Sequence, residues 1–362
     1  ACCTEKTGAL SPPEKRKERT GGMQGVSMTC ARPCGLFFVG IRAGFCAALL
    51  LTGLCVLWHG TAAHAQVTLL IPSQPSVEAP TAPAAPAQAK RAEKGGDEAR
   101  PENPAAKDTP AESAAPPAQA PAPPPTPVIE EEVDVLVSMM QPFRHEGLDM
   151  DMPQMFAVLR YDSDTPVHNG MLQPERRDLL GDMEEIRYLD RKAWGANVAL
   201  SAPGFYQFVI ESRPWWDAAR DCFVQHHVKT SLPVHGKSHG WNQPVGQRLE
   251  IAPLSRPFGL TAPALFAGVA LMEGKALPQA EVRMVRINTE KLSAPTPWHE
   301  ELAARTDANG QFAFVPNRPG WWCCTVTIPG TPLKGPDGQP KPLYVSALFW
   351  LYVDAPATEA KK

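Results

Sequence analysis

The sequence lacks an excess of charge of either sign, and it offers little that resembles a catalytic motif. Its 362 residues include 35 Lys and Arg against 38 Asp and Glu, which gives a formal net charge of −3. Without a basic excess there is no electrostatic basis for binding nucleic acid, so we expect no nucleic-acid partner. No His-Glu-x-x-His motif is present, and no Cys-x-x-Cys follows residue 65. We therefore expect a protein that is not an enzyme.

Stretches of helical length with a 3.6-residue apolar period are also missing. After Val133, apolar runs of five to nine residues alternate with turn signals, one of them the hairpin-type turn Asp307-Ala-Asn-Gly310. Short strands at this spacing predict an all-β fold of two immunoglobulin-like or transthyretin-like β-sandwich domains. Clustered prolines around Pro257 place the boundary between them, so that we expect domains at residues 128–255 and 256–355. The expected strands are 66–71, 133–140, 154–161, 197–200, 205–210, 222–232, 247–254, 265–272, 280–287, 311–315, 321–328 and 343–353.

The first 65 residues have the character of an export signal. Basic residues are followed by an apolar run from Leu36 to Trp58, interrupted by Arg42, and then by the small-residue pattern Ala63-x-Ala65. This order predicts a cleaved secretory signal peptide and an exported protein. The alternative is that the apolar run remains as an N-terminal membrane anchor.

Proline is concentrated in one segment rather than spread along the chain. The sequence contains 40 prolines, and residues 72–127 are rich in Pro and Ala. Such a composition buries too little apolar surface to offset the entropy of ordering, so we expect a disordered linker there. A short tail, 356–362, follows the second predicted domain.

Cysteine is scarce beyond the leader, where only Cys222, Cys323 and Cys324 remain. Neighbouring residues on a strand point to opposite faces, so Cys323 and Cys324 should do the same. One disulfide from Cys222 to either is one interpretation. The other is that all three are small buried apolar residues. The pairs Trp215-Trp216 and Trp321-Trp322 have two interpretations as well, as surfaces for a sugar or protein partner or as core residues.

Residues 139–152 gather the side chains that bind transition metals most readily. His145 supplies an imidazole, and Met150 and Met152 supply thioethers that softer ions accept. The alternative is that the methionines fill gaps in a core. On the strand at 222–232, alternation directs His226 inward and His227 outward, and an inward histidine is more often a core residue than a ligand.

Several stretches together resemble one family, the periplasmic components of nickel/cobalt uptake systems, which share a domain of unknown function. The most specific of them is Glu-Ile-Ala-Pro-Leu-Ser-Arg-Pro-Phe-Gly-Leu at 250–260, and residues 265–328 also resemble a carboxypeptidase-regulatory-like, transthyretin-like sandwich. The resemblance implies export, β-sandwich folding and a role beside a membrane metal importer of the ABC type. The other stretches are residues 70–73, 142–150, 203–208, 213–217, 240–246 and 319–322.

Three histidines occupy positions that the resemblance marks as metal ligands. The family motif His-Pro-Phe-Glu-His-Glu-Gly-Met corresponds to Gln141–Leu148. Of the two histidines in the motif, this chain has only the second, as His145. The family's strand histidine corresponds to His226, and a histidine beside the cleavage point corresponds to His64, which signal cleavage either retains or removes. We therefore expect an exported accessory protein that captures or relays Ni²⁺ or Co²⁺, with His64, His145 and His226 as ligands and Met150 or Met152 in support. The alternative is a structural or interaction protein, an adhesion or carbohydrate-binding module on a flexible stalk.

Overall fold

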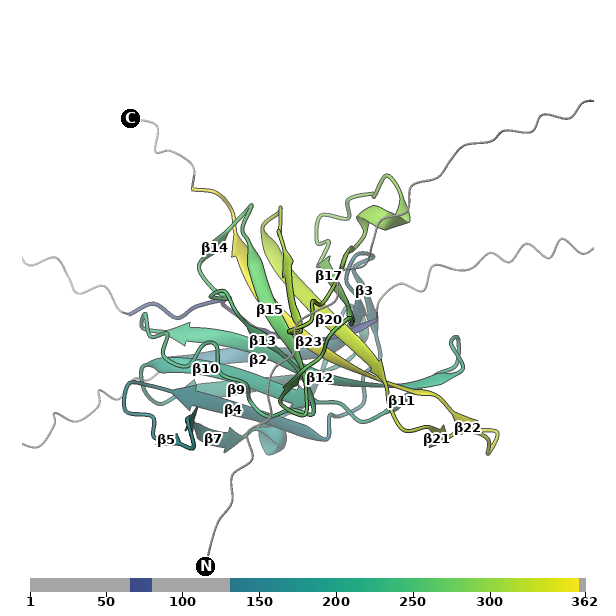
Figure 1. The fold of residues 1–362 in the computed structure, drawn as a ribbon, viewed down its shortest axis with the longest axis horizontal. Helices are drawn as coiled ribbons and strands as arrows, with labels where there is room; N and C mark the ends of the chain where they lie inside the picture. The colour runs from purple at the N-terminus through teal and green to yellow at the C-terminus, as the bar shows by residue number, and fades with distance from the viewer. Residues whose placement is uncertain (1–65, 80–130, 358–362) are drawn as a thin grey trace, which may run out of the picture. The chain divides into compact units, whose positions relative to one another are not determined.

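Strands form the framework of residues 66–79 and 131–357, the parts of the chain that this computed structural model describes (Figure 1). The predicted leader with His64, residues 80–127 of the predicted linker and the last residues of the tail lie outside those ranges. Within them the only helical segments are two short 3₁₀ turns, η1 (Leu180–Asp182) and η2 (Pro297–His299). The predicted all-β class is thus confirmed.

The first sheet is antiparallel and has five strands, in the order β1-β2-β9-β8, with β3 paired to β2. Its first two strands join segments that are far apart in the chain, because Val67 pairs with Met140 and Pro72 with Val135. The strands are β1 (Val67–Pro72), β2 (Glu131–Gln141), β3 (Glu146–Leu148), β8 (Glu184–Tyr188) and β9 (Arg191–Leu200).

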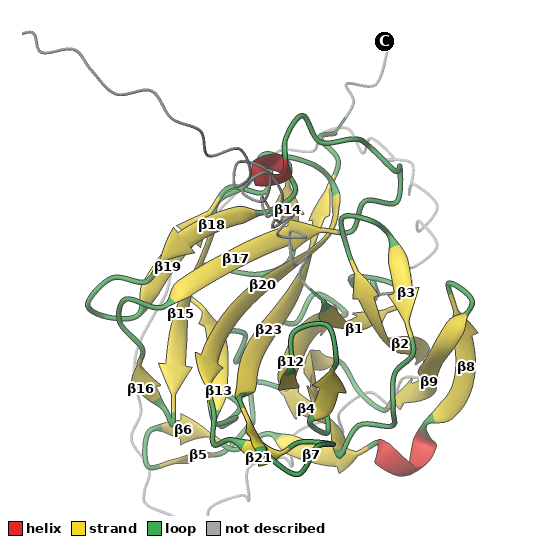
Figure 2. Ribbon diagram, turned by 90° about the vertical axis from the view of Figure 1, so that its right-hand side faces the viewer, coloured by secondary structure: helices red, strands yellow, loops and turns green. Residues whose placement is uncertain are grey.

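The second sheet has ten strands and draws on both predicted domains. Its order is β18-β17-β20-β23-β12-β10-β4-β7, with β11 beside β12 and β14 beside β23. The junction is the parallel pairing of β12 with β23, which joins one strand from each side of the predicted boundary at residue 255 (Figure 2). The strands are β4 (Met155–Tyr161), β7 (Glu175–Asp178), β10 (Gly204–Glu211), β11 (Trp215–Asp217), β12 (Cys222–Val234), β14 (Leu260–Thr261), β17 (Glu281–Arg286), β18 (Leu302–Arg305), β20 (Gly320–Pro329) and β23 (Leu343–Asp354).

A third sheet of four strands and two small hairpins complete the framework. The third sheet has the order β13-β15-β16, with β19 paired to β15. Its strands are β13 (Leu249–Pro253), β15 (Phe266–Met272), β16 (Lys275–Ala276) and β19 (Gln311–Phe314). The hairpins are β5 (Val167–His168) with β6 (Met171–Leu172), and β21 (Leu333–Lys334) with β22 (Pro340–Lys341).

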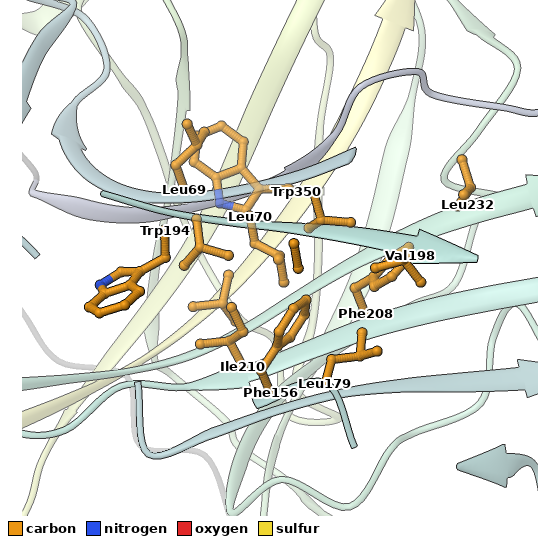
Figure 3. Close-up of a cluster of buried hydrophobic side chains, with 14 of the residues drawn as sticks. Leu69, Leu70, Phe156, Leu179, Trp194, Val198, Phe208, Ile210, Leu232 and Trp350 are labelled. Carbon is orange, nitrogen blue, oxygen red and sulfur yellow. The ribbon is translucent and has the colours of Figure 1, made fainter. Parts of the chain in front are cut away.

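Both faces of the ten-stranded sheet are covered, and each sandwich has its own core. The first core lies between this sheet and the five-stranded sheet, where Leu70, Trp194, Phe208 and Trp350 meet (Figure 3). The second core lies on the opposite face, against the four-stranded sheet, and includes Phe266. A smaller third cluster consists of Leu159, Tyr161, Phe205 and Val209, with Trp241, Val245 and Phe258 packed on it.

The cysteines follow this two-sided arrangement. Cys323 lies in the first core and Cys324 in the second, which confirms that they point to opposite faces of β20. All three cysteines of the described chain are free and buried, in agreement with their interpretation as small core residues. Burial raises the pKa of the Cys323 thiol to about 12, so this thiol is protonated at neutral pH and unreactive.

Three differences from the sequence-based expectations have physical reasons. The outward orientation predicted for His227 is wrong: this side chain is as buried as His226, because β12 lies inside a sheet covered on both faces. Strands β7 and β8 were not predicted, since almost all of their side chains are exposed and carry no apolar alternation. Residues 73–79 fall in the predicted linker, yet Val77 is buried and forms a parallel bridge with Val234.

Candidate functional site

The motif that carries the family resemblance forms a tight turn between β2 and β3. The His145 backbone N–H donates to the Pro142 carbonyl at 3.2 Å, and His145 has a positive φ of 53°. Its side chain is half-buried, whereas that of Glu146 is exposed. Partial burial and the charge of Lys291 lower the pKa of His145, so the imidazole is neutral at neutral pH. A neutral imidazole is the form that binds metal, but the same lysine opposes a dication.

A second segment holds this turn in place. The Asn288 backbone N–H donates to the Pro142 carbonyl at 3.0 Å, and its side-chain amide donates to the Phe143 carbonyl at 2.9 Å. A cleft of about 390 Å³ opens beside Phe143, with Trp298 on its rim. Trp298 is 87% exposed, the most exposed large apolar side chain in the described chain. Charges of both signs line this cleft, so its electrostatics select no ligand class.

His226 lies inside the first sandwich, beneath β1. Its Nδ1 accepts from the Thr68 backbone N–H at 3.2 Å, and the Thr68 hydroxyl lies 2.9 Å from the same nitrogen. Because a backbone N–H can only donate, the ring proton must be on Nε2. Histidines that bind metal through Nε2 usually donate Nδ1–H to an oxygen, which is the opposite arrangement. His226 therefore serves the packing of β1 onto β12 and is not prepared as a ligand.

The surroundings of His226 also keep it uncharged. Burial, with smaller contributions from the charges of Arg220 and His227, lowers its pKa from 6.5 to about 3. Trp215 packs edge-on against the ring, with centroids 4.6 Å apart. The folded protein thus holds a neutral imidazole at every pH at which it is expected to work.

We expect His226 to make the protein less stable in mild acid. In the unfolded chain a histidine binds a proton below about pH 6.5, whereas folded His226 does not until about pH 3. The unfolded state binds more protons in that window, so the free energy of unfolding falls as the pH falls, by about 2 kcal/mol from this group at pH 5. Urea denaturation at about pH 7.5 and pH 5 should show this loss reduced by about 2 kcal/mol in His226→Gln. An equal loss in both proteins would contradict the assignment.

The methionine candidates belong to the core rather than to a donor cluster. Met150 is buried in the first core, and Met152 packs against it. The Met150 carbonyl accepts from the Trp194 indole N–H at 3.1 Å, which fixes this segment on β9. Among residues 66–79 and 131–357 no group of three His, Cys, Asp or Glu side chains has a geometry that could hold a metal ion. The predicted ligands are not brought together in the described residues. His145 faces the 288–292 segment and His226 faces β1, while His64 lies outside the described residues.

The loop after β12 contains Gly-Lys-Ser-His-Gly at 236–240, a motif that the sequence reasoning wrongly took to be absent. Its spacing is that of the Gly-x-Ser-x-Gly nucleophile elbow, which requires a strand, a sharp turn and then a helix. Here β12 is followed by turns without a helix, and Ser238 and His239 are exposed. Neither side chain forms a hydrogen bond within the described part of the chain, so the elbow's triad geometry is not assembled.

The most unusual polar group of the described chain is a buried ion pair, Lys229 with Glu250, which sequence reasoning also missed. Both side chains are 2% exposed, and the ammonium donates to the carboxylate. The carboxylate also accepts the backbone N–H groups of Val245, at 2.7 Å, and Gly246, at 3.0 Å. The signal that could have indicated the pair was a charged residue inside each of two predicted strands, Lys229 in 222–232 and Glu250 in 247–254. The pair fastens the loop before β13 to the face of β12.

Comparison with known proteins bears on these sites. The model of a domain of unknown function, DUF4198, matches residues 121–329, more than half of the chain. The chain belongs to the DUF4198 family. That description states no activity, ligand or partner, and no curated protein matches the chain.

Two solved structures show only a remote likeness. The major pilin subunit BcpA of Bacillus cereus is 9% identical, with 61% of this chain and 62% of that chain covered and a TM-score of 0.13. Red sea bream transglutaminase is 11% identical, with 65% and 30% covered and a TM-score of 0.14. The chain thus spans less than two thirds of either protein, and these scores support no structural argument.

Three of the stretches that carry the family resemblance meet in one place, the third cluster. Phe205, Trp241 and Phe258 come from the stretches at 203–208, 240–246 and 250–260, and the Phe205 and Phe258 rings lie 5.6 Å apart. Glu250 begins the last of these stretches and bonds to the end of the second. In this DUF4198 member the three stretches serve to pack a loop onto the sheet.

Proposed function

We propose that this DUF4198 protein is an exported accessory protein that binds Ni²⁺ or Co²⁺ reversibly, without chemical turnover, and relays it to a membrane importer. The observation that carries the proposal is the register of the first sheet. Val67 pairs with Met140, and Gln141 pairs with Glu146, so the start of β1 and the His145 turn are at the same end of the sheet. His64 precedes Gln66 by two residues, a reach of at most about 7 Å. The proposal is that His145 binds the ion and that, where signal cleavage retains His64, its imidazole and the new α-amine join it.

The charges around the turn support weak and reversible binding rather than a permanent metal centre. His145 has a lowered pKa and the exposed carboxylate of Glu146 beside it, and both favour coordination. Lys291 opposes it, and the family's first histidine and its glutamate are replaced by Gln141 and Arg144. A relay must release its ion, so a site of moderate affinity suits that role. His226 and the two methionines have no part in this site.

Calorimetric titration of the exported, processed protein with Ni²⁺, Co²⁺, Cu²⁺ and Zn²⁺ tests the proposal. We expect His145→Ala to weaken Ni²⁺ or Co²⁺ binding about tenfold or more, because it removes one of few ligands. His168→Ala is the control, since His168 is an exposed histidine in the β5–β6 hairpin, outside the proposed site, and its loss should leave the affinity unchanged. His226→Gln should be equally silent. An intact mass of the same material establishes whether His64 is retained.

Either of two results would contradict the proposal. One is the absence of Ni²⁺ and Co²⁺ binding tighter than about 100 μM, a level at which a relay would not fill. The other is an affinity that neither His145→Ala nor His64→Ala alters.

A second candidate function is an interaction module, which Trp298 supports. An 87% exposed tryptophan at the rim of a 390 Å³ cleft suits a contact surface. Metal titration separates the two candidates, because a pure interaction module would show no such binding.

A further inference from the structure

A groove of about 670 Å³ opens along one face of the five-stranded sheet, and Ile71, Leu136 and Trp321, which line it, also pack against the first core. Its floor is a row of cross-strand partners: Ile71 pairs with Leu136, Leu136 with Gly195, and Gly195 with Glu184. Direct partners share one face, so this row crosses β1, β2, β9 and β8 in order (Figure 2). Trp321, from β20, forms the wall, and Tyr352 packs against it with ring centroids 5.3 Å apart.

The floor of the groove is apolar and open. Ile71 and Leu136 are half-buried, Ile186 is 37% exposed, and Gly195 contributes no side chain. A Cβ on Gly195 would come within 3.3 Å of Ile186. The glycine thus leaves the middle of the row free for an occupant.

The charges at the groove all have one sign. Asp134, Asp182 and Glu184 line it with exposed carboxylates, and no Lys or Arg is among its lining residues. Asp134 accepts from the Asn197 amide at 3.0 Å, while Asp182 and Glu184 form no ion pair within the described ranges. Like charges held together without counter-charges create a negative potential that attracts a cationic group.

We propose that this groove binds an extended peptide segment of another protein that carries Lys or Arg between apolar residues. Its apolar side chains would lie on Ile71 and Leu136, and its cations would face Asp182 and Glu184, with the Trp321 ring available for a cation–π contact. A neutral oligosaccharide uses the aromatic wall but gains little from three carboxylates that have no counter-charge, so the charge pattern favours the basic peptide. The inference does not depend on metal binding.

Fluorescence polarisation with the processed protein tests this. The probe is a labelled peptide of alternating Leu and Lys, and the control is a labelled peptide with Glu in place of each Lys. We expect the Lys peptide to bind at least about tenfold more tightly than the Glu peptide, and to weaken severalfold between about 50 and 300 mM salt. Asp182→Asn/Glu184→Gln should weaken it about tenfold, whereas Asp164→Asn/Glu273→Gln, which removes the same charge elsewhere, should change it less than about twofold.

Gly195→Val supplies a steric test that keeps all charges. We expect it to abolish peptide binding, with a melting temperature close to that of the unmodified protein. Should this variant fold poorly, the double variant Asp182→Asn/Glu184→Gln still tests the proposal, because both residues are exposed and their substitution should not disturb folding. Peptide binding that neither substitution alters would overturn the proposal. So would a neutral xylo- or cello-oligosaccharide that binds, is blocked by Gly195→Val and is indifferent to Asp182→Asn/Glu184→Gln.

Discussion

Glu250→Leu is expected to lower the free energy of unfolding by about 4 kcal/mol. The substitution leaves the Lys229 ammonium uncompensated at 2% exposure, and breaking a buried ion pair from one side typically costs 3–5 kcal/mol. It also removes the acceptor of the Val245 and Gly246 backbone N–H groups. Urea denaturation followed by circular dichroism measures the loss.

The matched experiment is a double-mutant cycle with Lys229→Met. We expect Lys229→Met/Glu250→Leu to be destabilised by much less than the sum of the single substitutions, with a coupling energy of about 2 kcal/mol or more, because the double variant buries no charge. Strict additivity would show that the two groups do not stabilise each other. The Phe349 ring, 5.7 Å from the Lys229 ammonium, is ready to pack against the methionine.

Gly240→Ala is expected to be the second most damaging of these substitutions, at about 3 kcal/mol. Gly240 has a φ of +81°, and a Cβ there would be 2.6 Å from the Tyr161 ring, which is buried in the third cluster. The left-handed backbone accounts for about 1 kcal/mol, and the forced movement of a packed ring for about 1–3 kcal/mol more.

Gly274→Ala separates these two causes. Gly274 has a similar φ of +74°, but a Cβ there would meet nothing within 4 Å. We expect it to cost only about 1 kcal/mol in the same thermal or urea denaturation. Equal losses for the two variants would show that contact with Tyr161 is not what Gly240 avoids.

The strands that could be predicted are those with buried faces. Alternation and apolar runs locate β10 and β23 to within about two residues, because burial selects the side chains that the pattern detects. It fails for β7, whose four residues Glu-Arg-Arg-Asp are all exposed and which forms only because β4 offers an edge. Local sequence does not carry that information.

The candidate site could be predicted even less completely, since its geometry depends on pairing between distant segments. The motif at 141–148 was visible, but its proximity to the start of β1 follows from the register of Val67 with Met140. His227 was misjudged for a similar reason: whether one face of a strand meets solvent depends on which sheet covers it, here β13 through Leu249. The groove at Trp321 combines four strands of the five-stranded sheet with β20 of the ten-stranded sheet, and no local pattern indicates it.

The position of β23 has a consequence for the order in which the molecule is completed. This last strand lies between β20 and β12 and supplies one wall of each core. Until the twelve residues of β23 emerge from the ribosome, β20 and β12 each lack a partner on the side that β23 occupies. Neither sandwich can therefore be completed as an independent unit, because a single strand closes both cores.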